Sequence, residues 1–209
     1  MLFRSSEERE AFAQDFYRSE RDISRRSFLG RMLLAALGAL GVAAIFPIRS
    51  LGPSPGRSLF TTSWRHGSRL VTSDGTPVVA ADVNVGSLLT VFPEGHTDAA
   101  DSQTVLIHVD PSAFSPPAGR ETWSPEGYLA YSKICTHAGC PVGLYEQATN
   151  RLFCPCHQSV FDVLDAAKPL AGPATRPLPQ LPLEVDGDGF LRAQSDFSGP
   201  VGPGWWNGP

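Results

Sequence analysis

The chain has 209 residues, enough for one modest domain together with an appendage. Only 18% of the residues are charged, whereas glycine and proline together number 39, and this composition favours a loop-rich β architecture over a helical one. From Arg57 to the end there are 9 basic and 15 acidic residues, a net charge of -6, and the absence of a basic patch argues against a nucleic-acid partner.

The first section of the chain, residues 1–22, is polar and highly charged. Phe12, Phe16 and Tyr17 recur in it at helical spacing. We predict a short cytoplasmic helix that docks on a partner, and a solvated tail is the alternative.

Residues 23–48 combine an export motif with a membrane anchor. Ser24-Arg25-Arg26-Ser27-Phe28-Leu29 looks like the twin-arginine export signal, S-R-R-x-F-L. The uncharged run Met32 to Ile48 follows, and as a helix it is about 25 Å long, near the lower limit for crossing a bilayer. Val42-Ala43-Ala44 matches a signal-peptide cleavage site poorly, so we predict an uncleaved anchor with its N-terminus inside. Arginines that serve only as positive-inside anchors are the alternative.

Two Gly- and Pro-containing segments flank the predicted head domain, residues 59–198. Residues 49–58 are predicted to be a linker, because proline lacks the N–H donor that a helix needs. Residues 199–209 form a tail in which Trp205 and Trp206 either touch the membrane interface or a partner subunit, or belong to a loose end.

The head is predicted to consist of short strands separated by turns. The expected strands are Leu59–Trp64, Ser87–Phe92, Thr104–Val109, Tyr128–Ser132, Arg151–Phe153, Val160–Val163, Leu183–Val185 and Phe190–Ala193. The last two should form a hairpin, because the Asp-Gly pairs between them favour a tight turn.

All four cysteines and two of the five histidines lie in two short boxes. The first box is Cys135-Thr136-His137-Ala138-Gly139-Cys140, and the second is Cys154-Pro155-Cys156-His157-Gln158-Ser159. The spacing C-x-H, sixteen residues, C-x-x-H places one thiolate and one imidazole on each of two loops, so that four ligands can converge on one inorganic centre. A structural zinc site and a pair of disulfides are the alternatives. The other three histidines, which are assigned no role, are His66, His96 and His108.

The two boxes resemble those of the Rieske iron-sulfur proteins of quinol-oxidising cytochrome bc complexes, which read C-T-H-x-G-C and C-P-C-H-x-S. The resemblance implies an all-β Rieske domain of stacked antiparallel sheets, preceded by one N-terminal transmembrane helix. It places the cluster-binding part at about residues 127–179 and implies that residues 49–58 act as a hinge.

The resemblance also implies one Rieske-type [2Fe-2S] cluster per chain. Cys135 and Cys154 would bind one iron, and His137 and His157 the other. Cys140 and Cys156 occupy the family's disulfide positions.

Four positions bear on the tuning and covering of such a cluster. Ser159 matches the family serine whose hydroxyl donates to a cluster sulfur, whereas Phe161 stands where high-potential members have tyrosine. We therefore expect a potential in the lower or middle part of the range of roughly -150 to +300 mV, which suits menaquinol. The segment Gly172 to Thr175 resembles the family's proline loop, with Thr175 in place of the commoner proline, and Ala138 replaces a frequent leucine.

By the same resemblance, the chain is expected to be the electron-transfer subunit of a quinol:cytochrome c oxidoreductase. The cluster would take an electron from quinol, coupled to proton uptake at His157, and pass it to a c-type cytochrome haem. The implied partners are a cytochrome b subunit and a c-type cytochrome within a dimeric multi-subunit membrane complex. The head would lie on the outer side of the cell membrane.

Two other functions are compatible with this pattern. One is the small Rieske subunit of another exported oxidase, similar to arsenite oxidase, in which the head is bound to a large molybdenum subunit. The other is a non-redox binding module stabilised by zinc. Co-purified haem, molybdenum or zinc distinguishes the three.

Overall fold

The computed structural model describes residues 5–22, 25–50 and 60–204. The chain divides into two units, Met1–Ser54 and Pro55–Pro209, and each is described by itself. The predicted linker from residue 51 onward, Ser24 of the export motif, and the two tryptophans of the tail lie outside the described residues.

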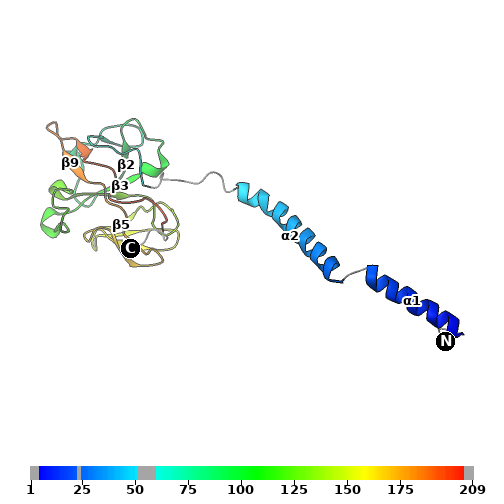
Figure 1. Cartoon of the computed structure of the whole chain (residues 1–209). Helices are drawn as coiled ribbons and strands as arrows, with labels where there is room; N and C mark the ends of the chain where they lie inside the picture. Colours follow the sequence, from blue (N-terminus) through cyan, green and yellow to red (C-terminus); the bar gives the residue numbers. More distant parts are fainter. Residues whose placement is uncertain (1–4, 23–24, 51–59, 205–209) are drawn as a thin grey trace. The chain divides into compact units, whose positions relative to one another are not determined.

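The described residues of the first unit form two helices, drawn as coiled ribbons in Figure 1. Helix α1, Ser6–Asp22, confirms the helix predicted near the N-terminus. It begins with reciprocal hydrogen bonds: the N–H of Glu8 donates to Ser5 Oγ at 3.2 Å, and the N–H of Ser5 donates to Glu8 Oε2 at 3.3 Å. This capping box pairs two of the N–H groups that a helix start leaves free.

Helix α2, Arg25–Ser50, contains the predicted anchor. Its residues Ser27–Ser50 are long and apolar enough to cross a membrane, with a length of about 36 Å at 1.5 Å per residue. The helix runs two residues beyond the predicted end at Ile48, so Arg49 and Ser50 are helical and not part of the linker. The Ser50 hydroxyl donates to the carbonyl oxygen of Pro47 at 2.7 Å, and this contact supports the last turn.

The second unit is built of antiparallel strands, as predicted. One four-stranded sheet has the order β1-β2-β3-β4, and a second has the order β5-β6-β7-β8, while β9 and β10 form a hairpin. The strands are β1 Leu70–Val71, β2 Leu88–Pro93, β3 Thr104–His108, β4 Tyr128–Ser132, β5 Leu144–Glu146, β6 Arg151–Phe153, β7 Val160–Asp162, β8 Lys168–Ala171, β9 Leu183–Val185 and β10 Leu191–Ala193.

Strand β3 lies between two hydrophobic cores, because successive side chains of a strand point to opposite faces. Leu106 belongs to the base core, whose largest fully buried members are Trp64, Leu70, Leu106, Leu181, Leu183 and Leu191. Val105 and Ile107 belong to the cluster-side core, together with Leu129, Tyr131, Leu152, Phe161, Cys135 and Cys154. The two box cysteines are thus part of the packed interior.

The strand predicted at Leu59–Trp64 was wrong for the described residues 60–64. Trp64 is fully buried, but its indole N–H donates to the carbonyl oxygen of Ser102 at 2.9 Å and to Thr104 Oγ1 at 3.1 Å. The N–H of Thr62 donates to Asp196 Oδ2 at 2.8 Å. Hydrogen bonds that involve side chains hold this segment in place, whereas a strand would be held by backbone hydrogen bonds to a neighbouring strand.

Candidate metal centre

The two boxes form loops with the same backbone hydrogen bonds. In the first loop, the N–H of Cys135 donates to the carbonyl oxygen of Cys140 at 2.8 Å, and the N–H of Gly139 donates to that of Cys135 at 2.9 Å. In the second, the N–H of Cys154 donates to the carbonyl oxygen of Ser159 at 2.9 Å, and the N–H of Gln158 donates to that of Cys154 at 3.0 Å. Both loops therefore close on their first cysteine.

Each loop is held by the strands or bridges beside it. The first loop follows β4, and its ends meet in an antiparallel bridge between Ile134 and Pro141. The second loop connects β6 to β7, which pair from Arg151 to Asp162. Gly139 has a φ of +81°, a conformation that glycine adopts without strain.

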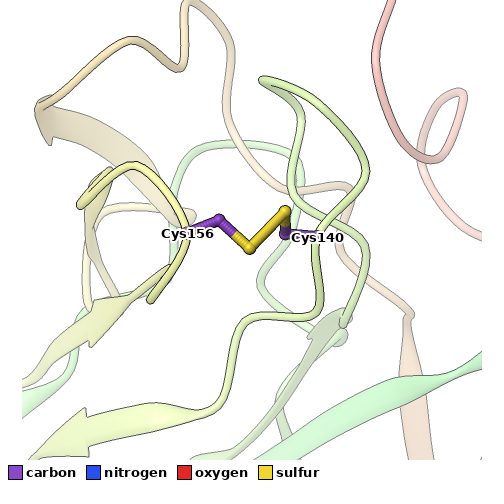
Figure 2. The surroundings of a disulfide bond; sticks show 2 residues. All are labelled: Cys140 and Cys156. Atoms are coloured by element: carbon purple, nitrogen blue, oxygen red, sulfur yellow. A yellow bond between two sulfur atoms is a disulfide. The ribbon is translucent and has the colours of Figure 1, made fainter.

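A disulfide joins the two loops. It links Cys140 to Cys156, sixteen residues apart, as Figure 2 shows. The predicted pairing is confirmed. Cys135 and Cys154 remain free thiols, so the alternative of two disulfides is excluded.

The two free thiols are buried side by side. Cys135 is 0% exposed and Cys154 is 1% exposed. Burial raises the pKa of the Cys135 thiol, and the Cys154 thiol within hydrogen-bond reach raises that pKa further. The raised pKa favours the protonated thiol. A bound metal ion would favour the thiolate instead, because a thiol that coordinates a metal loses its proton.

The box histidines come together as well. The ring centroids of His137 and His157 are 4.7 Å apart, and the ring planes meet at 85°. Nδ1 of His137 is buried and has no hydrogen-bond partner among the described residues, whereas His157 is exposed. Buried polar atoms are almost always paired, and the nitrogen of a neutral imidazole is a common metal ligand, so Nδ1 of His137 is a candidate for binding a metal.

The donors match a mixed sulfur and nitrogen metal centre. Two buried thiols and two imidazoles provide the S₂N₂ set that a Rieske [2Fe-2S] cluster requires. The sulfur of Cys154 also lies within 4.8 Å of the sulfurs of Cys140 and Cys156. Those two sulfurs are bonded to each other, so they are not available as ligands.

A third segment, Gly172 to Arg176, covers both loops. The N–H of Ala174 donates to Ser159 Oγ at 3.1 Å. The hydroxyl of Thr136 donates to the carbonyl oxygen of Arg176 at 2.7 Å. Neither Thr136 nor Arg176 was singled out from the sequence, because the contact joins residues 40 positions apart in the chain.

Other residues named from the sequence have structural surroundings. Phe161 is fully buried in the cluster-side core, and Ala138 is exposed. His108 stacks on Tyr128 with ring centroids 4.1 Å apart, and Nδ1 of His66 lies 2.9 Å from the carbonyl oxygen of Gln194. Neither of these two histidines lies in the boxes.

The part of the chain that carries both boxes matches a known family. Residues 96–182 match the Rieske [2Fe-2S] domain family. The cytochrome bc1 complex Rieske iron-sulfur subunit of Streptomyces lividans is 44% identical over 167 residues, which cover 76% of this chain and 98% of the relative. The corresponding subunit of Streptomyces coelicolor is 42% identical over 193 residues, covering 88% of this chain and 54% of the relative. The chain thus spans about half the length of the S. coelicolor protein.

A relative named as part of a different enzyme is also similar. The putative respiratory nitrate reductase subunit Rieske of Haloferax mediterranei is 39% identical over 184 residues. The match covers 87% of this chain and 81% of that protein.

Proposed function

We propose that this chain, which belongs to the family of Rieske [2Fe-2S] iron-sulfur subunits of cytochrome bc1 complexes, transfers electrons from quinol to a c-type cytochrome haem. One observation carries the proposal within the structure: two adjacent imidazole rings and two adjacent buried thiols are presented by loops with equivalent hydrogen bonding.

Four residues would hold the cluster. Cys135 and Cys154 would bind one iron through their buried sulfurs, and His137 and His157 would bind the other. The unpaired Nδ1 of His137 supports its place in this set. When bound, the cluster supplies a one-electron acceptor whose potential is raised by the two histidine ligands.

His157 would accept the proton from quinol. Its exposed ring can hydrogen-bond the quinol hydroxyl through the nitrogen that does not bind iron. Added negative charge beside an imidazole favours its protonated form, so the proton affinity of this nitrogen rises with electron uptake. Electron transfer and proton transfer are thereby coupled at one residue.

Ser159 and Phe161 would set the potential. Ser159 Oγ accepts a hydrogen bond from Ala174 and is fully buried, so its own proton is left to donate to a cluster sulfur. Phe161 has no hydroxyl to contribute. We propose a potential in the lower or middle part of the range of roughly -150 to +300 mV, suited to menaquinol.

The proposed setting is a membrane complex. Helix α2 would anchor the chain by a single span, with the N-terminus in the cytoplasm and the head outside. The twin-arginine motif at residues 24–29 supports export of the folded head. The partners would be a cytochrome b subunit and a c-type cytochrome, because the relatives are named as subunits of a cytochrome bc1 complex. The proposed complex is dimeric.

The experiment is to isolate the complex from membranes through a tag on this chain. Co-purified b-type and c-type haem, and reduction of the cluster by menaquinol, would support the proposal.

The similarity to the H. mediterranei protein favours a second candidate, a Rieske subunit of another exported respiratory enzyme. Molybdenum without b-type haem in the isolated complex would select that candidate and refute the first.

The ligand set has its own test. His157→Ala should abolish the Rieske electron paramagnetic resonance (EPR) signal, because one iron loses a ligand. His66→Ala is the matched control, since His66 is an exposed histidine outside the boxes. An unchanged signal in His157→Ala would overturn the ligand assignment.

A further inference from the structure

The end of the described chain packs against the first loop. The segment Pro200–Gly204 follows the last strand, and Val201 within it is 1% exposed. A Cβ atom built at Gly139 would lie 3.5 Å from Cδ of Pro203, and one built at Gly202 would lie 3.2 Å from Cγ2 of Ile134. We call this segment the C-terminal strap.

Arg176 joins the strap to the first loop. Its Nη1 donates to the carbonyl oxygen of Pro200 at 2.8 Å, and its Nη2 donates to that of Gly202. Its own carbonyl oxygen accepts the hydrogen bond from Thr136, which lies between the proposed ligands Cys135 and His137. One residue therefore connects the strap, the third segment and the first loop.

The guanidinium of Arg176 is a fixed and partly desolvated charge. The side chain is half-buried, and its Nε is buried with no hydrogen-bond partner among the described residues. No carboxylate of the described chain lies within 4.0 Å of it, in contrast to Arg192, which pairs with Asp186 at 2.5 Å. Burial lowers the pKa of Arg176, but a guanidinium stays charged at neutral pH. Water and salt screen such a charge less than an exposed one.

We propose that Arg176 is a positioning residue that holds the C-terminal strap against the first loop and, through its unneutralised charge, raises the reduction potential of the cluster. This inference rests on the proposed function, because it takes the first loop to carry two cluster ligands. A nearby cation stabilises the reduced cluster, which is the more negative form, more than the oxidised one. The strap fixes where that cation lies.

The test is a redox titration of the full chain in detergent, loaded with its cluster and followed by EPR. Arg176→Met removes the charge and both hydrogen bonds, and should lower the midpoint potential. Arg176→Lys keeps the charge and should lower it less. The matched control is Arg65→Met, because Arg65 Nη1 also donates to two carbonyl oxygens, those of Thr62 and Trp64, outside the boxes. Its potential should equal that of the wild type.

The proposal is overturned if Arg176→Met has the wild-type midpoint potential. It is also overturned if Arg176→Lys lowers the midpoint potential as much as Arg176→Met does. If Arg176→Met takes up no cluster, Arg176→Gln is titrated in its place, since it keeps one amide donor without the charge. If Arg65→Met takes up the cluster but neither Arg176→Met nor Arg176→Gln does, the result would support the positioning role of Arg176. A wild-type chain without a Rieske EPR signal would instead refute the proposed function.

Discussion

A Cβ atom at Gly172 would lie 2.6 Å from Cα of Ser159, a distance shorter than Cβ atoms show in proteins. It would also lie 2.7 Å from the carbonyl oxygen of Gln158. All of these neighbours are backbone atoms, so no side-chain rotation can relieve the clash. The third segment therefore approaches the second loop at a distance that only glycine permits.

A side chain at a φ of +84° costs about 1–3 kcal/mol in backbone strain alone. We expect Gly172→Ala to lower the free energy of unfolding of the head by more than this strain, because the clash adds to it. The measurement is a urea titration that follows the visible absorbance of the cluster. Gly75→Ala is the matched control, because Gly75 has the same φ of +84° with no atom within 4 Å. Equal losses in the two variants would show that the contact with Ser159 has no effect.

Replacing the Ser159 hydroxyl should change both the potential and the stability. Ser159→Ala removes the proposed donor to the reduced cluster and leaves the N–H of Ala174 unpaired, so we expect a lower midpoint potential and a loss of about 1–3 kcal/mol in the free energy of unfolding. Redox titration and denaturation measure the two effects. Ser124→Ala removes another buried hydroxyl, which accepts from Gln180 at 3.0 Å, and should leave the potential unchanged. A wild-type potential in Ser159→Ala would refute the hydrogen bond to the cluster.

Removing the disulfide should lower the free energy of unfolding by about 3 kcal/mol, the chain-entropy expectation for a loop of this size. The variant is Cys140→Ala combined with Cys156→Ala. Because this bond directly joins the two loops, cluster release should shift to a lower urea concentration together with unfolding. A change below about 0.5 kcal/mol, the usual scale of a neutral surface substitution, would contradict this expectation.

Tyr131 of strand β4 contacts the residue that follows strand β7. Its hydroxyl donates to the carbonyl oxygen of Val163 at 2.8 Å in a fully buried position. Tyr131→Phe leaves that carbonyl unpaired, and we expect a loss of about 1–3 kcal/mol at neutral pH. Tyr17→Phe should have no comparable effect, because Tyr17 is 62% exposed.

Burial raises the pKa of Tyr131, and this sets the sign of a pH dependence. The unfolded phenol ionises near pH 10, whereas the folded phenol keeps its proton to a higher pH. The stabilisation from the buried phenol is therefore complete below about pH 10 and declines above it. The stability difference between wild type and Tyr131→Phe should shrink as pH rises above 10, and a constant difference in chemical denaturation would contradict this assignment.

Local pattern predicted much of the fold. Strands β4 and β6 coincide with the predicted ranges, and the β9–β10 hairpin forms around the Asp-Gly turn. Three strands were missed because their local signals are weak: β1 has two residues, β5 has three, and β8 contains Pro169. Proline is tolerated in β8 because that strand lies at the edge of its sheet.

The pairing of the two boxes was predictable because the residue types and spacings within them are themselves the signal, and the ligand set stays a prediction. The disulfide between Cys140 and Cys156 followed from the family's box pattern. Arg176 and the C-terminal strap were not predictable in this way. Their contacts join segments that are 24 to 40 residues apart, and no periodicity or short motif marks such a contact.

The most direct test of the account is metal and sulfide analysis of the purified full chain, combined with EPR after reduction. The account predicts two iron atoms and two acid-labile sulfides per chain, with a Rieske EPR signal in the reduced protein. Zinc as the only metal, or iron without a Rieske signal, would contradict it.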